Sequence, residues 1–150
     1  MSIYVIGFLG TNRIKTAIEI SKKKCMTFFN LDEEIVKRDG RSLKRICMMM
    51  GEHEYRNKEY EILKELSSRD NVVVACGDGV ILDDMCTTLL KKNQVIVADA
   101  SLTVESLWEN AKNDFSIPYA FMCDSNLERK KSKFYKLYKQ RKVLYDQFRR

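Results

Sequence analysis

Histidine is almost absent from this sequence of 150 residues, and His53 is the single one. A histidine-based catalytic triad or a histidine-rich metal site therefore has little to build on. The five cysteines are odd in number and form no C-x-x-C pair. Scattered cysteines of this kind favour reduced thiols in an intracellular protein. We expect no protein-bound metal.

Long hydrophobic runs are also missing. No stretch approaches the apolar length of a membrane span, and the N-terminus lacks a signal-peptide profile. Internal repeats and low-complexity linkers are absent as well. A length of 150 residues, with 45% apolar and 32% charged residues, suits one compact domain with a proper core. We expect a cytoplasmic protein with no membrane contact.

Positive charge is concentrated at the end of the chain. The net charge is +6, and residues 129–150 carry ten Lys or Arg and only Asp146 as an acid. Such a segment could contact nucleic acid. Apolar residues are interleaved at roughly helical spacing, however: Phe134, Leu137, Tyr138, Leu144, Tyr145 and Phe148. This spacing indicates helices that pack one face, so we do not expect nucleic-acid binding.

Short apolar segments alternate with helical patterns along the chain. Buried strands are predicted over 3–6, 26–29, 72–76 and 95–98. Helices are predicted up to about residue 24, over 33–38, 42–50, 52–68, 82–90 and 103–112, and in the basic tail. This alternation predicts a three-layer, doubly wound α/β fold with a parallel sheet. Ligands bind such sheets outside the carboxyl ends of the strands, where the turns at Gly7, Asn30/Asp32 and Gly77–Gly79 fall.

The first sixteen residues have the layout of a phosphate-binding loop. The apolar run 3–6 breaks at Gly7, and a glycine turn leads into a helical pattern. In such a loop, backbone N–H groups and a helix N-terminus face an anion. The full signature requires a second glycine, a lysine and then a serine or threonine. Those positions hold Asn12, Arg13 and Ile14, so the Walker A signature is degenerate.

Motifs in register along nearly the whole chain resemble those of the shikimate kinase family. The family's G-x-x-G-x-G-K-S-T loop falls on Gly7 to Lys15, and its D-x-D-x-x-I on Asn30 to Ile35. Its G-E-x-x-F-R-x-x-E, G-G-G, D-A-S and R-x-P-L-Y motifs fall on 51–59, Gly77-Asp78-Gly79, 99–101 and 141–145. The family normally adds a last strand and helix after R-x-P-L-Y, whereas this sequence ends at Arg150.

The resemblance implies a P-loop kinase fold and ATP-dependent phosphorylation of the 3-hydroxyl of shikimate, a step of aromatic amino acid (chorismate) biosynthesis. It implies Mg-ATP as cofactor if the protein is active and none otherwise. The partner would be a small molecule, shikimate or a similar hydroxy-carboxylate, bound by a monomer. We expect a single domain over residues 1–150, with an irregular lid at about 112–126 and a basic helical tail over 127–150.

On the acceptor side, the resemblance assigns Asp32 to hold the reacting hydroxyl and accept its proton. The alternative interpretation is that Asp32 only caps the following helix. Arg56 and Arg141 match the two clamps of the substrate carboxylate, and a solvated surface arginine is the alternative for each. The turn against the substrate matches Gly77, Asp78 and Gly79. Asp78 departs from the pattern and adds a negative charge, which disfavours a carboxylate ligand unless Arg56 and Arg141 outweigh it.

On the nucleotide side, the resemblance assigns these residues: Gly7, Gly10, Thr11, Asn12, Arg13, Ile14 and Lys15. Arg13 keeps the charge of the P-loop lysine and is the candidate catalytic cation, although it is bulkier. Ile14 replaces the hydroxyl residue that coordinates Mg²⁺ and supplies no ligand. Asn12 narrows the loop where the family has glycine. Lys15-Thr16 resembles the missing pair displaced by two residues, and would require the loop to shift.

Two further losses concern charge. Asn30 replaces the first Asp of the family's D-x-D motif, which lies near the metal. In the family, the mobile lid carries an arginine just before a proline. In this sequence the residue before Pro118 is Ile117. Losing an equivalent arginine elsewhere costs about 10³-fold or more in rate.

Three functions remain open. The first is shikimate kinase, with Asp32 as base and Arg13 or Lys15 as phosphate cation. The second is a catalytically inactive relative, a pseudoenzyme that keeps a shikimate-like pocket and acts as a binding or regulatory protein. The third is a different small kinase or a nucleic-acid-associated protein that uses the basic tail. The replacements in the loop favour impaired catalysis, and the resemblance makes shikimate phosphorylation the reaction to test.

Overall fold

A four-stranded parallel sheet forms the centre of the computed structural model, which describes residues 2–114, 117 and 119–148. The strand order is β2-β3-β1-β4. The strands are β1 (Ser2–Ile6), β2 (Thr27–Asn30), β3 (Val72–Ala75) and β4 (Gln94–Val97). In the central register, Tyr4 of β1 lies beside Val74 of β3 and Val95 of β4. All four predicted strands are present, with ends shifted by one residue or less.

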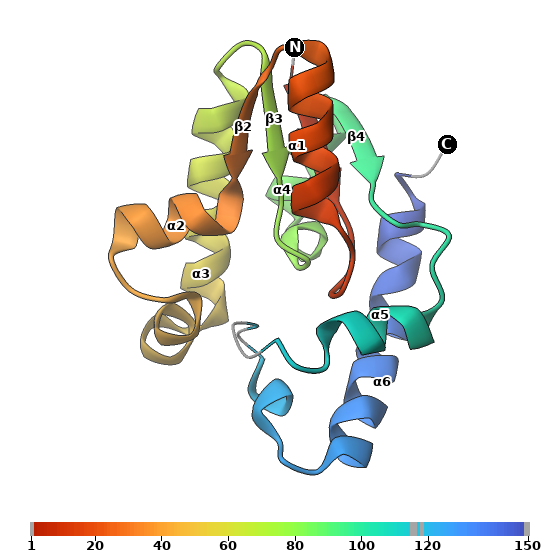
Figure 1. Cartoon of the computed structure of the whole chain (residues 1–150). Helices are drawn as coiled ribbons and strands as arrows, with labels where there is room; N and C mark the ends of the chain where they lie inside the picture. Colours follow the sequence, from red (N-terminus) through yellow and green to blue (C-terminus); the bar gives the residue numbers. More distant parts are fainter. Residues whose placement is uncertain (1, 115–116, 118, 149–150) are drawn as a thin grey trace.

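Helices connect and cover these strands (Figure 1). They are α1 (Arg13–Lys24), α2 (Leu31–Asp39), α3 (Leu43–Ser67), α4 (Asp84–Lys91), α5 (Val104–Ala111) and α6 (Leu127–Asp146). Short 3-10 turns are found at η1 (Val80–Leu82) and η2 (Ala120–Cys123). Across the described residues, none of these helices has both the length and the hydropathy needed to cross a bilayer.

The sheet is buried on both faces, as a parallel sheet must be. Successive residues of one strand point to opposite sides, so Val73 joins a small core with Ala17 of α1, while Val74 joins the large core on the other face. The large core includes residues of α3, α4, α5 and α6. Figure 1 shows α1 alone in front of the sheet and α4 behind it. The predicted three-layer α/β fold is confirmed.

The helical segment α3 is interrupted at the boundary between the two helices that were predicted over 42–50 and 52–68. The structure has the single element α3, with a kink at Gly51, whose backbone has φ 81° and ψ 166°. A positive φ is accessible to glycine at little cost, which explains why the helix changes direction at this residue. Ser42 begins the element, and its hydroxyl accepts a hydrogen bond from the Arg45 N–H at 3.3 Å.

The basic tail is one long helix packed on the core. Phe8, just after β1, makes edge-to-face contacts with Phe134 at 5.1 Å and Tyr138 at 5.4 Å between ring centroids. Trp108 of α5 contacts Phe134 at 5.3 Å. Aromatic pairs of this kind favour such offset geometries. α6 therefore packs one face on the core, as the spacing of its apolar residues predicted, and the structure shows that this face contacts Phe8 in the loop after β1.

Candidate active site

The turns after β1, β2 and β3 meet at one end of the sheet, toward which the strands point (Figure 1). Arg13, the first residue of α1, donates a hydrogen bond to the carbonyl oxygen of Cys76, after β3, at 2.9 Å. A cavity of about 700 Å³ opens between the turns, lined among others by Arg13, Ile14, Asn30, Asp32, Asp78 and Ile117. The convergence expected from the sequence is therefore observed.

Asp32 lies inside the first turn of α2, and the interpretation that it caps this helix is wrong. The cap is Asn30, whose backbone is extended and whose side-chain oxygen accepts hydrogen bonds from the N–H groups of Asp32, at 3.1 Å, and Glu33, at 3.4 Å. The Asp32 carboxylate instead accepts a hydrogen bond from the Tyr55 hydroxyl at 3.4 Å. Asn30, at the family's first Asp position, therefore has a structural role.

Burial raises the pKa of the Asp32 carboxyl above its usual value. The nearby Arg13 guanidinium opposes this shift, and the negative charge of Asp78 adds to it. A carboxylate that binds a proton more tightly than usual is a better acceptor for the proton of a hydroxyl. Position, neighbours and pKa are thus all compatible with a proton acceptor at the cavity.

Arg56 and Glu59 form a buried ion pair on α3. Their side chains are 3.1 Å apart, and Glu52 lies 3.4 Å from the same guanidinium. The guanidinium also faces the ring of Tyr55 at 5.0 Å. A Cβ atom at Gly79 would lie 2.2 Å from Arg56 Nη2, so this glycine leaves the space that the arginine occupies. The alternative of Arg56 as a solvated surface residue is wrong, since it is 9% exposed.

Glu59 was part of a sequence motif but not of the predicted site. It is fully buried, and its Oε2 has no hydrogen-bond partner. Burial raises the pKa of the Glu59 carboxyl to about 7, and Arg56 opposes the shift. The spacing of three residues between Arg56 and Glu59 on one helix was the signal that could have identified the pair.

We predict that Glu59 makes the protein less stable as the pH rises from about 5 to 7. The folded carboxyl keeps its proton up to about pH 7, whereas an unfolded glutamate loses it near pH 4.3. The native state then binds more protons than the unfolded state, so the free energy of unfolding falls by on the order of 2 kcal/mol over this interval. Urea denaturation at several pH values measures the fall, which Glu59→Gln is expected to reduce.

The control is Glu61→Gln, an exposed residue of the same helix. It should reproduce the pH profile of the unchanged protein. Identical profiles for Glu59→Gln and Glu61→Gln would contradict the prediction.

Arg141 and Asp78 lie together, buried, with Arg141 donating a hydrogen bond to the Asp78 carboxylate. Arg141 is 4% exposed, so the alternative of a surface charge is wrong for this residue too. The turn that contains Asp78 needs no unusual backbone, because none of Gly77, Asp78 and Gly79 has a positive φ. Gly77 instead leaves room for Asp32, whose Oδ1 would lie 3.0 Å from an added Cβ atom.

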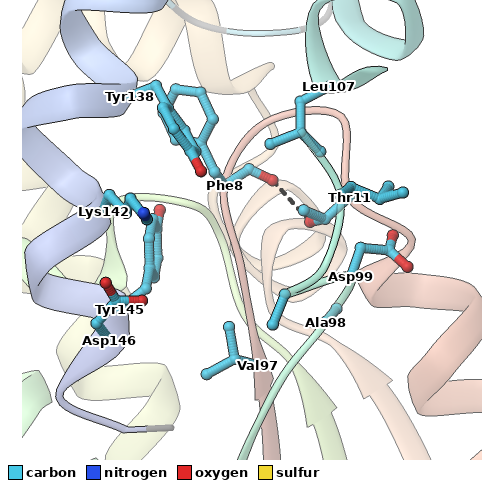
Figure 2. Close-up of a pocket in the computed structure, with 12 residues that line it drawn as sticks. Phe8, Thr11, Val97, Ala98, Asp99, Leu107, Tyr138, Lys142, Tyr145 and Asp146 are labelled. Carbon is cyan, nitrogen blue, oxygen red and sulfur yellow. Dashed lines mark hydrogen bonds between the residues drawn. The ribbon is translucent and has the colours of Figure 1, made fainter. Parts of the chain in front are cut away.

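The loop after β1 is closed by contacts from within the protein. The Thr11 hydroxyl donates a hydrogen bond to the Phe8 carbonyl at 2.6 Å, as drawn in Figure 2. Gly10 has φ +84°, and the Asn110 side chain donates to its carbonyl oxygen at 3.0 Å. At Gly7, an added Cβ atom would lie 2.8 Å from the Thr11 hydroxyl. These contacts fix the loop in its present form.

A carboxylate of the protein lies at the start of α1. The backbone N–H of Asn12, the residue before this helix, donates a hydrogen bond to Asp99, which follows β4. A helix N-terminus attracts anions, and in a phosphate-binding loop the anion is the nucleotide. Asp99 was not among the predicted site residues, although it belongs to the matched D-A-S motif.

A small cavity of about 40 Å³ lies beside the loop, between the end of β4 and α6 (Figure 2). Phe8, Thr11, Asp99, Leu107, Tyr138 and Lys142 are among its lining residues. It has room for little more than one water molecule. The larger space at the loop is a cavity of about 680 Å³ on its outer side, whose lining includes Asn12, Arg13, Ile14 and Lys15.

The residues at the start of α1 do not fit a magnesium ion. Ile14 occupies the position of the metal-binding hydroxyl, and its side chain is 48% exposed without an oxygen to offer. Among the described residues, no group of three or more His, Cys, Asp or Glu side chains could hold a metal. Lys15 is exposed on the first turn of α1 and lines the outer cavity, so the displaced Lys15-Thr16 pair lies on the helix itself.

Part of the predicted lid, namely Phe115, Ser116 and Pro118, lies outside the described residues, as do Arg149 and Arg150 of the tail. Ile117, at the position of the family's lid arginine, is 7% exposed and lines the cavity of Asp32. An apolar wall therefore stands where the family has a cation. Tyr119, which sequence reasoning did not select, contacts Asp78 and Arg141.

A parallel α/β sheet with a strand, a glycine loop and a helix N-terminus at its carboxyl end is the framework of phosphate- and nucleotide-binding α/β proteins, a class that includes the P-loop kinases. Comparison with known proteins narrows this class. The family model described as "Shikimate kinase" matches residues 13–150, and the chain therefore belongs to the shikimate kinase family.

Individual relatives agree. The chain is 37% identical over 150 residues to the bifunctional shikimate kinase/3-dehydroquinate synthase of Thermotoga maritima, and covers 28% of that protein. It is 33% identical over 97 residues to the shikimate kinase of Aquifex aeolicus, covering 65% of this chain and 58% of that one. The chain thus spans less than two thirds of either relative.

Solved structures of other shikimate kinases are similar to this fold. The structure of shikimate kinase from Acinetobacter baumannii in complex with shikimate superposes with a TM-score of 0.84 at 26% identity, over 98% of this chain and 79% of that one. The shikimate kinase of Bacteroides thetaiotaomicron gives a TM-score of 0.86 at 16% identity, over 98% and 82% of the two chains, and supports the fold alone.

Proposed function

We propose that this chain is a binding member of the shikimate kinase family, which holds a small hydroxylated ring compound at Asp32 and has lost productive transfer from Mg-ATP. The observation that carries the proposal is the contrast between the two halves of the site. On the acceptor side, Asp32 lines an open cavity of about 700 Å³, and Arg56 is buried against Gly79, next to the lining residue Asp78. On the nucleotide side, the exposed Ile14 stands in place of the metal-binding hydroxyl residue, and the Asp99 carboxylate accepts a hydrogen bond from the backbone N–H of Asn12.

Arg13 supports the same conclusion. Arg13 lines both cavities, and its guanidinium donates a hydrogen bond to the Cys76 carbonyl in the turn after β3. An arginine bound in this way stabilises the turn after β3 and interacts electrostatically with Asp32. The proposal includes the expectation of a cytoplasmic monomer with a small-molecule partner, a single domain over residues 1–150, and no nucleic acid or membrane.

Shikimate kinase activity is the second candidate, with Mg-ATP as cofactor. It is favoured by Asp32, whose raised pKa and position at the cavity suit a base for an acceptor hydroxyl. The names of the relatives make shikimate the acceptor to test.

We predict saturable binding of shikimate by isothermal titration calorimetry, and no binding of Mg-ATP in a separate titration. The physical reason is that the acceptor half keeps its charged residues, whereas the nucleotide half lacks its metal ligand. Tight Mg-ATP binding with turnover in a coupled assay would overturn the proposal in favour of the kinase. Absence of any binding of shikimate and of its methyl ester would overturn both candidates.

A further inference from the structure

The carboxylate of Asp78 is surrounded by hydrogen-bond donors of the protein. Arg141 and the hydroxyl of Tyr119 both donate to its Oδ2, the latter at 2.7 Å. Tyr119 also accepts from Arg141 Nη1 at 2.8 Å, and its ring lies 5.0 Å from the guanidinium carbon. Asp78 is 8% exposed and Arg141 4%. The three side chains form a closed cluster from the turn after β3, the segment before η2, and α6.

The backbone holds this cluster in place as well. The hydroxyl of Tyr145, on α6, donates to the backbone carbonyl of Asp78. The φ of Asp78 is not positive, so an aspartate is accommodated without backbone strain. Asp78 is thus part of the packed structure, and its carboxylate cannot leave Arg141 of α6 without also losing the hydrogen bond from Tyr119.

Each of the three arginines assigned to the site has an acceptor within the protein, although the Nε of Arg56 has none and only Arg13 lines the cavity, together with Lys37 and Lys44. Arg56 is paired with Glu59 at 3.1 Å, Arg141 with Asp78, and Arg13 with the Cys76 carbonyl at 2.9 Å. A guanidinium that clamps a ligand carboxylate must offer its N–H fork to that ligand. An incoming carboxylate would have to displace Asp78 from Arg141, and would meet the charge of Asp78 while doing so.

From this arrangement we propose that Asp78 takes the place of a ligand carboxylate on Arg141, so that the cavity at Asp32 selects an uncharged polyhydroxylated ring over a hydroxy-carboxylate. The proposal rests on the proposed function, since it names the class of ligand that the acceptor half takes. Asp32 and Ser42 offer hydrogen-bonding groups for hydroxyls, while Leu9, Val36, Leu43 and Ile117 offer an apolar wall. The carboxylate of Asp78 is the group that discriminates between the uncharged ring and the hydroxy-carboxylate.

Calorimetric titration of the whole chain with shikimate and with its uncharged methyl ester tests the proposal. The unchanged protein should bind the ester at least about tenfold more tightly than shikimate, because the acid meets the negative charge of Asp78 at the cavity and finds Arg141 already paired. Asp78→Gly should reverse this preference by freeing Arg141. Asp78→Asn keeps a hydrogen-bond acceptor for Tyr119 while removing the charge, and should shift the preference in the same direction. Asp84→Asn, an exposed aspartate just beyond the same turn, should leave it unchanged.

A second measurement reports on Arg141 without any ring compound. Asp78→Gly leaves a vacancy the size of a carboxylate beside the guanidinium, so sodium formate should raise its melting temperature by about 2 °C or more relative to sodium chloride of equal ionic strength. The unchanged protein and Asp84→Asn should show no such difference.

The outcomes separate the two proposals. Binding of both ring compounds with a preference that Asp78→Gly and Asp78→Asn leave unchanged would overturn the role of Asp78 and keep the proposed function. A formate effect equal in all variants would overturn it too. If formate raises the melting temperature of Asp78→Gly but neither ring compound binds, the proposed function and the ligand class are both overturned. Only the pairing of Asp78 with Arg141 would then stand.

Discussion

Replacing three loop residues together, by Asn12→Gly, Arg13→Lys and Ile14→Ser, is expected to raise ATP-dependent phosphorylation of an acceptor by about 10²- to 10³-fold. Serine returns an oxygen ligand for Mg²⁺ at the start of α1, where Ile14 now offers an apolar side chain. Lysine returns a compact cation in place of a guanidinium that is bound to the Cys76 carbonyl. Glycine removes the side chain that narrows the loop.

A coupled assay for ADP formation, with shikimate and its methyl ester as acceptors, measures the gain. Adding Asp32→Asn to the triple variant is the control, and it should abolish most of the gain if transfer takes place at the predicted site. Should the triple variant bind Mg-ATP and still show no more turnover than the unchanged chain, the limiting defect would lie at Asp78 or in the lid. The loop would then not be the cause of impaired catalysis.

Gly10→Ala is expected to lower the free energy of unfolding by about 3 kcal/mol. Two costs add at this residue. Its φ of +84° is unfavourable for alanine, and an added Cβ atom would lie 2.3 Å from the backbone carbonyl oxygen of Leu107 in α5. Because a backbone atom cannot move aside as a flexible side chain can, the loop and α5 must separate. Guanidinium denaturation measures the loss.

Gly40 supplies the matched control for this prediction. Its φ is +89°, nearly the same as that of Gly10, but nothing lies within 4 Å of an added Cβ atom. Gly40→Ala should therefore show only the conformational cost, about 1 kcal/mol. An equal loss in the two variants would show that the contact between the loop and Leu107 contributes nothing to stability.

Together these experiments test which properties of the shikimate kinase family this chain retains. The chain belongs to a family of kinases, and its fold retains the convergence of three turns at one end of the sheet. On the nucleotide half of that site, one N–H at the start of α1, that of Asn12, is already bound by the carboxylate of Asp99. The acceptor half shows the same principle at Arg141, which Asp78 already satisfies.

The sequence was sufficient for the fold because the signals were local and repeated. Apolar runs of four or five residues, separated by helical patterns, can hardly form anything except a covered parallel sheet. The breaks at Gly7, Asn30 and Gly77 then had to fall at its carboxyl end. For the same reason Asp32 was predicted correctly to lie beside the loop, although its supposed role as a helix cap was wrong.

Charge pairing could not be predicted in the same way. Asp78 and Arg141 are separated by 63 positions, and no spacing rule links them. Tyr119 lies in an irregular segment where neither helical nor strand periodicity fixes the direction of a side chain. The Asp99 contact with Asn12 spans 87 positions and depends on where β4 ends relative to α1.

The sequence by itself determined the class of fold and the family, and it places Asn12, Arg13 and Ile14 where the resemblance predicts a glycine, a lysine and a hydroxyl residue, since these are properties of residues in register. The tertiary structure decided which charges meet. It placed an aspartate on one arginine, a glutamate on another and a backbone carbonyl on the third. The physical reason is that electrostatic energies depend on distance and burial in space, and both are set only when the helices and strands have packed.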